Sequence, residues 1–225
     1  MAHTAMVLGA TGLVGGEVVK LLVKDPRFDS VVALARRPLS WTDPKLTVQI
    51  LDFDQPASWH LEAARADVLF SALGTTLKQA GSKEAQYKVD VTYQLEIARA
   101  AAAAGVTTYA LVSAMGANAS SSSFYMKMRG ELEEGVRALP FARLRILRPG
   151  MLDGERAEDR PKERWAIAAL KVVGSLPGLR SVRPIQGAAM ARALVAAALD
   201  ETPGVKVYGP GELHALAAAP ASAGA

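Results

Sequence analysis

Three glycines near the start of the chain constrain its fold more than any other feature. Gly9, Gly12 and Gly15 follow a short apolar run at residues 5–8, and a stretch with one apolar helical face comes next. The order predicts a buried strand, a tight turn and a helix. Gly9 permits the turn, Gly12 lets a ligand approach the backbone, and Gly15 allows close packing of helix against strand.

Such a turn directs unpaired N–H groups and the positive end of a helix dipole at an anion, which suits a dinucleotide's diphosphate. The spacing is Gly-x-x-Gly-x-x-Gly, and glycines of this kind could also simply end a strand. Their place between a strand and an amphipathic helix favours the nucleotide. The residues expected to hold the diphosphate are Gly9, Thr11, Gly12, Leu13, Val14 and Gly15.

The rest of the chain alternates between apolar runs and helical stretches. Further strands are predicted at residues 30–34, 46–51, 67–71, 108–112, 141–147 and 205–208. Helices are predicted at residues 82–104, 124–139 and 184–199, with a weaker one at 57–65. Strands separated by helices predict an α/β fold, a doubly wound parallel sheet with helices on both faces.

The 225 residues show no internal repeat and no linker, so one domain is expected over residues 1–214. Residues 150–182 are less regular and form either a small C-terminal cap over a substrate cleft or a segment packed on the sheet edge. Residues 215–225 are rich in Ala, Pro, Ser and Gly and are expected to form a flexible tail.

The end of the second predicted strand bears on the choice of nucleotide. An NAD-selective site usually has an acidic residue there, which binds the ribose 2′-hydroxyl. This chain has Ala35 followed by Arg36 and Arg37. A guanidinium can bind a 2′-phosphate with two hydrogen bonds, so NADP(H) is expected and NAD(H) is less favoured. Ordinary surface arginines are the alternative.

Other candidate residues also fall where predicted strands end, and ligands of parallel sheets bind at those ends. Asp52 could accept a hydrogen bond from the adenine amino group or could cap the following loop. Gly74 and Thr75 would lie over the phosphates and ribose. The remaining expected cofactor contacts are Phe53, Leu73 and Pro149.

A candidate catalytic set follows the fifth predicted strand. Tyr125 and Arg129 lie one helical turn apart, and Ser113 stands at the strand end. A fixed cation favours the phenolate form of a tyrosine, which makes its proton easier to transfer. Ser113 would hold a substrate carbonyl while Tyr125 delivers the proton and the nucleotide supplies a hydride. A Tyr with a basic residue four positions later also arises by chance in such a chain. The catalytic assignment of Tyr125 and Arg129 therefore depends on their position after the fifth predicted strand, near Ser113.

These residues resemble the Tat-interacting, NADPH-binding oxidoreductase-like group (NAD(P)H-binding, NmrA-like) of the atypical short-chain dehydrogenase/reductase superfamily. The stretches that carry the resemblance are Gly9-Ala-Thr-Gly12-Leu-Val-Gly15, Ala35-Arg36-Arg37, Asp52-Phe53, Leu73-Gly74-Thr75-Thr76, Lys88-Val89-Asp90, Leu111-Val112-Ser113, Phe124-Tyr125, Gly130-Glu131-Leu132-Glu133, Arg148-Pro149-Gly150 and Gly174-Ser175-Leu176-Pro177.

The resemblance implies a Rossmann-like fold, bound NADP(H) and a Ser-Tyr-Lys catalytic set. Arg129 stands where the family has the lysine, and a guanidinium is planar, bulkier and does not deprotonate. Two functions are therefore expected as alternatives. One is a reductase of a small carbonyl substrate, and the other is a catalytically weak NADPH sensor that acts through a protein partner. An isomerase or dehydratase has no residue signal of its own.

Composition argues against several other kinds of protein and binding site. The net charge of +4 comes from scattered arginines, so no nucleic-acid partner is expected. No apolar run approaches the roughly 18 residues of a membrane span. There is no cysteine, and His3, His60 and His214 lack metal-ligand spacing, so neither disulfide nor metal is expected. Without cysteine or a signal-like segment, a cytoplasmic protein is expected. The oligomeric state stays open.

Overall fold

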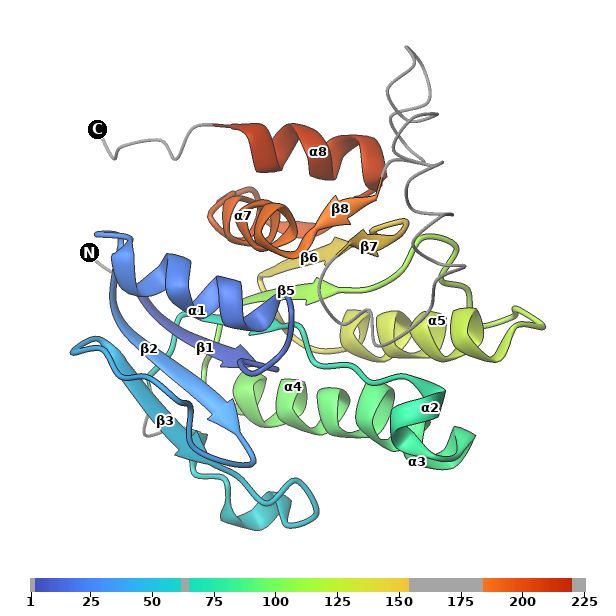
Figure 1. Cartoon of the computed structure of the whole chain (residues 1–225), viewed down its shortest axis with the longest axis horizontal. Coiled ribbons are helices and arrows are strands. Elements are labelled where there is room, and N and C mark those ends of the chain that lie inside the picture. The colour runs from blue at the N-terminus through green and yellow to red at the C-terminus, as the bar shows by residue number, and fades with distance from the viewer. Residues whose placement is uncertain (1–2, 62–64, 154–183, 220–225) are drawn as a thin grey trace.

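The core of the protein is a seven-stranded parallel sheet (Figure 1). The computed structural model describes residues 3–61, 65–153 and 184–219. Its sheet order is β3-β2-β1-β4-β5-β6-β9, and every pairing in it is parallel. The strands are β1 His3–Leu8, β2 Phe28–Ala35, β3 Leu46–Ile50, β4 Val68–Ser71, β5 Thr108–Val112, β6 Arg143–Leu147 and β9 Gly204–Tyr208. The order reverses between β1 and β4, the place where such sheets bind ligands.

Helices cover both faces of this sheet (Figure 1). One face carries α1 (Gly15–Lys24), α7 (Gly187–Ala198) and α8 (Pro210–Ala218), and the other carries α4 (Tyr93–Ala103) and α5 (Phe124–Arg137). Short helices α2 (Leu77–Ala80) and α3 (Lys83–Tyr87) precede α4. The prediction of a doubly wound, Rossmann-like α/β fold is confirmed.

The apolar run of β1 explains why the sheet is buried on both sides. Ala5 and Val7 point into the core beneath α1 and α7, whereas Met6 and Leu8 point into the core beneath α4 and α5. All four side chains have no exposed surface. A strand between two helical layers reads as a continuous apolar run, not as an alternating one.

The helix predicted at residues 82–104 is interrupted. Between α3 and α4 lies a π-helical turn, η3 (Lys88–Thr92). It buries Asp90 completely, and Gln94 in the first turn of α4 is buried as well. Both side chains make hydrogen bonds there, and a periodicity of 3.6 residues contains no signal for the wider turn.

The weak helix predicted at residues 57–65 does not form over its described part. The chain makes a 3-10 turn, η1 (Pro56–Ser58), and then adopts a positive φ at His60 and at Arg65. Trp59 is buried in the core beneath α4 and α5. Burial of this large ring fixes the segment as an irregular loop, and residues 62–64 lie outside the described residues.

The C-terminal third contains two differences from expectation. The helix predicted from residue 184 begins at Gly187, because β8 (Ile185–Gln186) first pairs with β7 (Leu152–Asp153). Residues 215–218, expected in the flexible tail, belong to α8. Glu212 accepts the Gly209 N–H at 2.7 Å, and Leu213 and Ala217 are buried. The expected cap at 150–182 falls mostly on residues 154–183, outside the described residues.

A buried arginine ties β6 to the connection between α7 and β9. Arg145 has no exposed surface, although it lies in the middle of the strand. Its guanidinium donates to backbone carbonyl oxygens at 2.7 Å for Asp200 and 2.9 Å for Gly204. The other acceptors are the carbonyl oxygens of Leu144, Ala197 and Thr202. These contacts satisfy backbone groups that would otherwise be buried without partners.

No helix within the described ranges is long and apolar enough to cross a membrane. In the same ranges, no group of three or more His, Cys, Asp or Glu side chains is arranged to hold a metal ion.

Candidate functional site

The glycine turn has the geometry of an anion cradle. Gly9 has φ +86° and lies so close to the loop after β4 that an added Cβ would lie 2.7 Å from the backbone of Ala72. A Cβ on Gly15 would lie 2.2 Å from the carbonyl oxygen of Gly9. Since real Cβ atoms do not approach backbone this closely, both positions require glycine.

The start of α1 leaves backbone donors available. Its N-cap residue, Val14, has no side-chain acceptor for them. Thr11 is exposed and Gly12 and Leu13 are half-buried, whereas Val14 and Gly15 are buried. Thr11, Gly12 and Leu13 can therefore touch a ligand directly, and Val14 and Gly15 can contribute only through the backbone. The N–H groups of Gly12 and Gly16 donate within the turn, whereas those of Leu13, Val14 and Gly15 have no acceptor among the described residues. These free N–H groups and the missing Cβ atoms fit a diphosphate.

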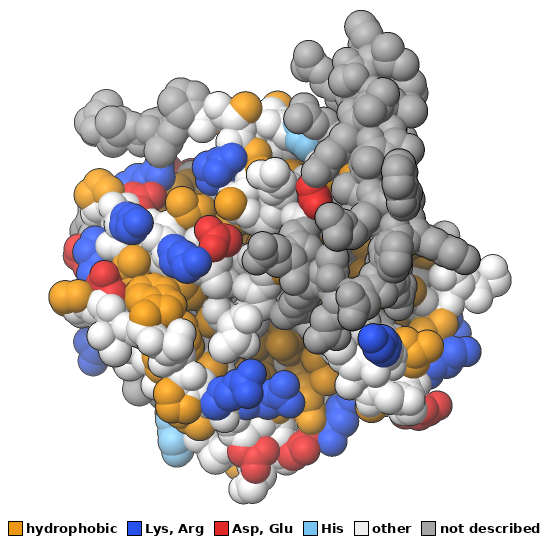
Figure 2. Space-filling model, in the orientation of Figure 1, with side chains coloured by type: hydrophobic (Ala, Val, Ile, Leu, Met, Phe, Trp, Pro, Cys, Tyr) orange, Lys and Arg blue, Asp and Glu red, His pale blue; other side chains and the backbone are white. Residues whose placement is uncertain are grey.

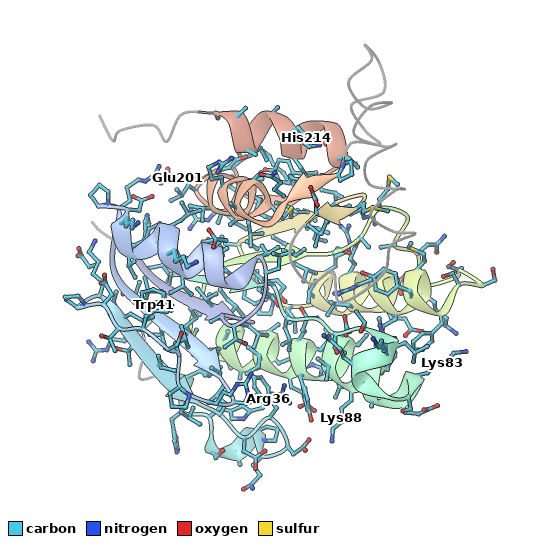
Figure 3. The ribbon with its side chains drawn as sticks, in the orientation of Figure 1. Arg36, Trp41, Lys83, Lys88, Glu201 and His214 are labelled. Carbon is cyan, nitrogen blue, oxygen red and sulfur yellow. The ribbon has the colours of Figure 1, made fainter. Side chains whose placement is uncertain are left out.

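Arg36 and Arg37 lie directly after β2, at the same edge of the sheet as the turn. Both side chains are exposed, and neither bonds to another described residue. Figure 3 labels Arg36 at this edge, and Figure 2 shows a group of basic side chains at the same place. Their guanidinium groups are free to meet an anionic ligand.

The residues after β3 serve mainly their own loop. The Asp52 carboxylate accepts the Asp54 N–H at 2.9 Å and the Gln55 amide at 2.8 Å. The ring of Phe53 is 7% exposed and packs between Trp59 and Tyr93. Asp52 could bind the adenine amino group or cap the following loop, and these hydrogen bonds are those of a loop cap.

Asp54 joins this loop to the π-helical turn. Its carboxylate accepts from Lys88 at 2.6 Å and from the Tyr93 hydroxyl at 2.7 Å. The hydrogen bonds from Lys88 and Tyr93 hold the pKa of Asp54 below its ordinary value. Lys88 therefore lies at the ligand-binding edge but is already paired.

Hydrogen bonds with α3 and with the π-helical turn fix the loop after β4. The Thr75 N–H donates to Asp90 Oδ2 at 2.9 Å, and the Gln86 side chain donates to the Thr75 carbonyl at 3.3 Å. A Cβ on Gly74 would lie 3.1 Å from Arg129 Nη2. The loop after β4 thus meets the glycine turn at Ala72 and approaches the catalytic candidate Arg129 at Gly74.

Arg129 is buried, with 6% of its surface exposed. Its Nη2 donates to Asp90 Oδ1 at 2.7 Å, and its Cζ lies 5.5 Å from the ring centroid of Tyr125. Nε and Nη1 make no hydrogen bond to any described residue. Tyr125 is 38% exposed, so its hydroxyl lies beside a buried cation and within reach of a ligand.

Burial and the neighbouring charges shift the pKa values of Asp90 and Arg129 in opposite directions. Burial raises the pKa of Asp90, while Arg129 and the Thr75 N–H act to lower it. Burial acts to lower the pKa of Arg129, but Tyr125 and Asp90 raise it above its ordinary value. We take the pair as ionised, because the 2.7 Å contact and the backbone donor both favour the carboxylate.

Ser113 is placed differently from the role predicted for it. Its hydroxyl donates to Glu133 Oε1 at 2.5 Å, and no hydrogen bond joins it to Tyr125 among the described residues. Arg148 donates to the same carboxylate from Nε at 2.9 Å and from Nη2 at 2.6 Å. The hydrogen bond to Glu133 raises the pKa of Arg148. The hydroxyl hydrogen of Ser113 is therefore already used inside the protein.

Glu133 and Asp90 are two residues of the site whose roles the sequence did not reveal. A glutamate on a predicted amphipathic helix is ordinarily expected to face solvent, yet Glu133 is 2% exposed. One signal was present, since Glu133 follows Arg129 by four residues and so lies on the same face of α5.

Pro149 and Gly130 fix the loop that follows β5. The Pro149 carbonyl accepts the Met115 N–H at 2.8 Å, which joins the ends of β5 and β6. A Cβ on Gly130 would lie 2.1 Å from the Ala119 nitrogen, so the loop lies directly on α5. Pro149 is buried, and its contribution to the site is through this loop.

Comparison with known proteins shows which family shares these features. A family model described as NAD(P)H-binding matches residues 9–164. Protein FMP52-1, mitochondrial, from Scheffersomyces stipitis is 39% identical over 95% of this chain and 98% of its own length. Protein FMP52, mitochondrial, from Coccidioides immitis is 36% identical over 96% of this chain and 94% of its own length.

Solved structures share the fold at lower identity. The enzyme WbmH of Bordetella bronchiseptica, solved in complex with NAD⁺, matches with a TM-score of 0.69 and 14% identity over 94% of this chain and 77% of its own. The ADP-L-glycero-D-manno-heptose-6-epimerase of Helicobacter pylori matches with a TM-score of 0.66 and 16% identity over 92% and 77%. These likenesses concern the fold alone.

The expectation of a cytoplasmic protein is wrong in the light of these relatives, whose names place them in mitochondria. The expectation rested on the absence of cysteine and of a signal-like segment. Cysteine content reports the redox conditions under which a chain folds and does not distinguish one reducing compartment from another.

Proposed function

The chain belongs to the NAD(P)H-binding family, in an atypical short-chain dehydrogenase/reductase-like group, and we propose that it is an oxidoreductase that uses NADP(H). The observation that carries this proposal is the glycine turn, where Gly9 and Gly15 leave no room for a Cβ beside unpaired N–H groups. The free guanidinium groups of Arg36 and Arg37 at the same edge support NADP(H) over NAD(H).

Replacing Arg36 by alanine tests the choice of nucleotide. We expect NADPH affinity to fall about tenfold or more, because a phosphate loses a charged donor, and NADH affinity to change less than about twofold. Isothermal titration calorimetry of both nucleotides measures the difference. Arg99→Ala, which removes an exposed arginine from α4, is the matched control and should change neither affinity. Equal affinities of the unmutated protein for NADPH and NADH would contradict NADP(H) selectivity.

The proposed reaction is reduction of a small carbonyl compound. Bound NADPH would supply a hydride to the carbonyl carbon. Tyr125, which is accessible and lies beside Arg129, would donate its hydroxyl proton to the carbonyl oxygen and recover one from solvent. Arg129 would stabilise the resulting phenolate by its positive charge.

Ser113 fits this reaction in a changed role. Because its hydrogen is donated to Glu133, its oxygen offers lone pairs to a ligand and has no donor for a carbonyl. We therefore propose that Ser113 accepts a hydrogen bond from a hydroxyl, as in the alcohol form of the substrate. The polarising donor for the carbonyl form is then Tyr125 alone.

A Tyr125→Phe variant tests the catalytic role. We expect turnover to fall by about 10²-fold or more, since the proton donor is removed, while NADPH affinity stays within about twofold. The measurement is NADPH oxidation followed at 340 nm over a panel of carbonyl substrates, with calorimetry for binding. Tyr87→Phe, on α3, serves as the control and should retain turnover. Unchanged turnover in Tyr125→Phe would contradict the assignment.

A second candidate is a catalytically weak NADPH sensor that acts through a protein partner. One observation favours it: the Ser113 hydroxyl and the Arg129 guanidinium are both paired with buried carboxylates, Glu133 and Asp90. The same substrate panel separates the two functions. Tight NADPH binding with no oxidation of NADPH by any substrate would support the sensor.

A further inference from the structure

Asp90 joins two parts of the site that are far apart in the sequence. Its carboxylate has no exposed surface, and each of its oxygens has its own donor. Oδ2 accepts the Thr75 N–H at 2.9 Å, and Oδ1 accepts Arg129 Nη2 at 2.7 Å. One side chain therefore sets the position of Arg129 on α5 relative to the loop after β4.

The backbone around Asp90 is held as firmly as its side chain. Gln94 donates to the Asp90 carbonyl at 2.7 Å and accepts from the Ser71 hydroxyl at 2.7 Å. Ser71 is the last residue of β4, so the π-helical turn η3 is tied to the strand that carries the loop. A π-helical turn inside an α-helix commonly marks a functional site.

Arg129 carries two donor groups, Nε and Nη1, that have no acceptor in the part of the chain that the structure describes. Both nitrogen atoms are buried. A buried N–H without an acceptor destabilises a protein, so an arginine of this kind calls for an acceptor beyond the described residues. Oxygen atoms of a ligand would satisfy it.

The topology places the second half of a dinucleotide beside these donors. A diphosphate at the glycine turn lies at the end of β1, and the free arginines lie at the end of β2 on one side of it. The other nucleoside must then extend over the ends of β4 and β5, on the opposite side. Gly74, Thr75 and Arg129 lie there.

We propose that Asp90 is the residue that positions the nicotinamide half of the nucleotide, by fixing the Thr75 loop and the Arg129 guanidinium to one another. This proposal rests on the proposed binding of NADP(H). The new element is that separate sets of residues recognise the two halves of the nucleotide. Only the set that binds the nicotinamide half depends on Asp90.

Comparing NADPH with adenosine 2′,5′-bisphosphate tests the proposal. The bisphosphate contains only the adenosine half, with its 2′-phosphate, and does not reach the ends of β4 and β5. In Asp90→Asn we expect NADPH affinity to fall about tenfold or more, as Arg129 loses its fixed position, and bisphosphate affinity to change less than about twofold. Calorimetry at one salt concentration measures both. Glu96→Gln, which neutralises another acid on the following helix, should alter neither affinity.

A second variant covers the case in which an unpaired Arg129 prevents folding. Asp90→Asn combined with Arg129→Gln removes both charges and leaves two amides that can still pair, so we expect a folded protein with the same selective loss of NADPH affinity. A similar loss of both ligands in a folded variant, or no loss of NADPH, would overturn the positioning role. If the unmutated protein binds the bisphosphate and NADPH equally poorly, the proposed function fails first, and this inference with it.

Discussion

Replacing Gly15 by alanine is expected to weaken NADPH binding severely. The added Cβ would lie 2.2 Å from the Gly9 carbonyl oxygen and 2.7 Å from its carbonyl carbon, both of which are backbone atoms. Neither atom can move without opening the turn or displacing α1. We expect NADPH affinity to fall about 100-fold or more, which is ~2.7 kcal/mol, and the free energy of unfolding to fall by about 1–3 kcal/mol. Calorimetry and urea unfolding measure the two effects.

The neighbouring glycine provides a control that differs by one position. A Cβ on Gly16 would lie 3.4 Å from the Ala10 carbonyl oxygen, which is an ordinary contact. Gly16→Ala should therefore keep NADPH affinity within about twofold and raise stability by up to about 1 kcal/mol, because alanine favours a helix over glycine. If both alanine variants bind NADPH alike, the close approach of helix and turn does not govern binding.

The second large effect concerns stability. We expect Arg145→Met to lower the free energy of unfolding by about 3–5 kcal/mol, since methionine fills part of the volume but donates no hydrogen bond. The carbonyl oxygens of Asp200 and Gly204, now paired at 2.7 and 2.9 Å, would lose their donors. Urea unfolding followed by circular dichroism gives the change.

Arg143, two residues earlier on β6, is the matched control. Its guanidinium is half-buried and donates to two side-chain hydroxyls, that of Thr108 at 2.7 Å and that of Thr107 at 3.4 Å, so its loss leaves no backbone carbonyl of a described residue without a donor. Arg143→Met should cost about 1 kcal/mol or less. A similar cost for the two variants would show that the backbone contacts of Arg145 contribute little.

The first part of the fold follows from local sequence. The apolar run before Gly9 and the amphipathic stretch after Gly15 are each complete within a few residues, and the structure has β1, the turn and α1 where they were predicted. The segments that were mispredicted depend on distant contacts. Trp59 is held in an irregular loop by the ring of Phe53, and α8 is stabilised where Leu213 and Ala217 become buried.

The candidate site was predictable only in its outline. Strand ends identified Gly9, Arg36, Gly74 and Ser113, because parallel strands bring their carboxyl ends to one edge. The partners of these residues were not predictable. Asp90 is placed by a π-helical turn, and Glu133 is buried by contacts with Ser113 and Arg148, which directly follow two different strands. Charged residues on a helix read as solvated unless their tertiary partners are known.

The π-helical turn also limits how the gene can change. Such a turn holds one residue more than an α-helical turn, so losing a single codon between Lys88 and Thr92 would leave an uninterrupted helix. The helical parts before and after the turn would keep nearly the same relative orientation, because the wider turn had taken up the extra residue, but the residues inside the turn would move to new positions around the helix axis. Asp90 could then no longer face Arg129 while Gln94 faces Ser71. Insertions and deletions in this five-residue stretch should therefore be eliminated by selection more strictly than substitutions at its exposed positions.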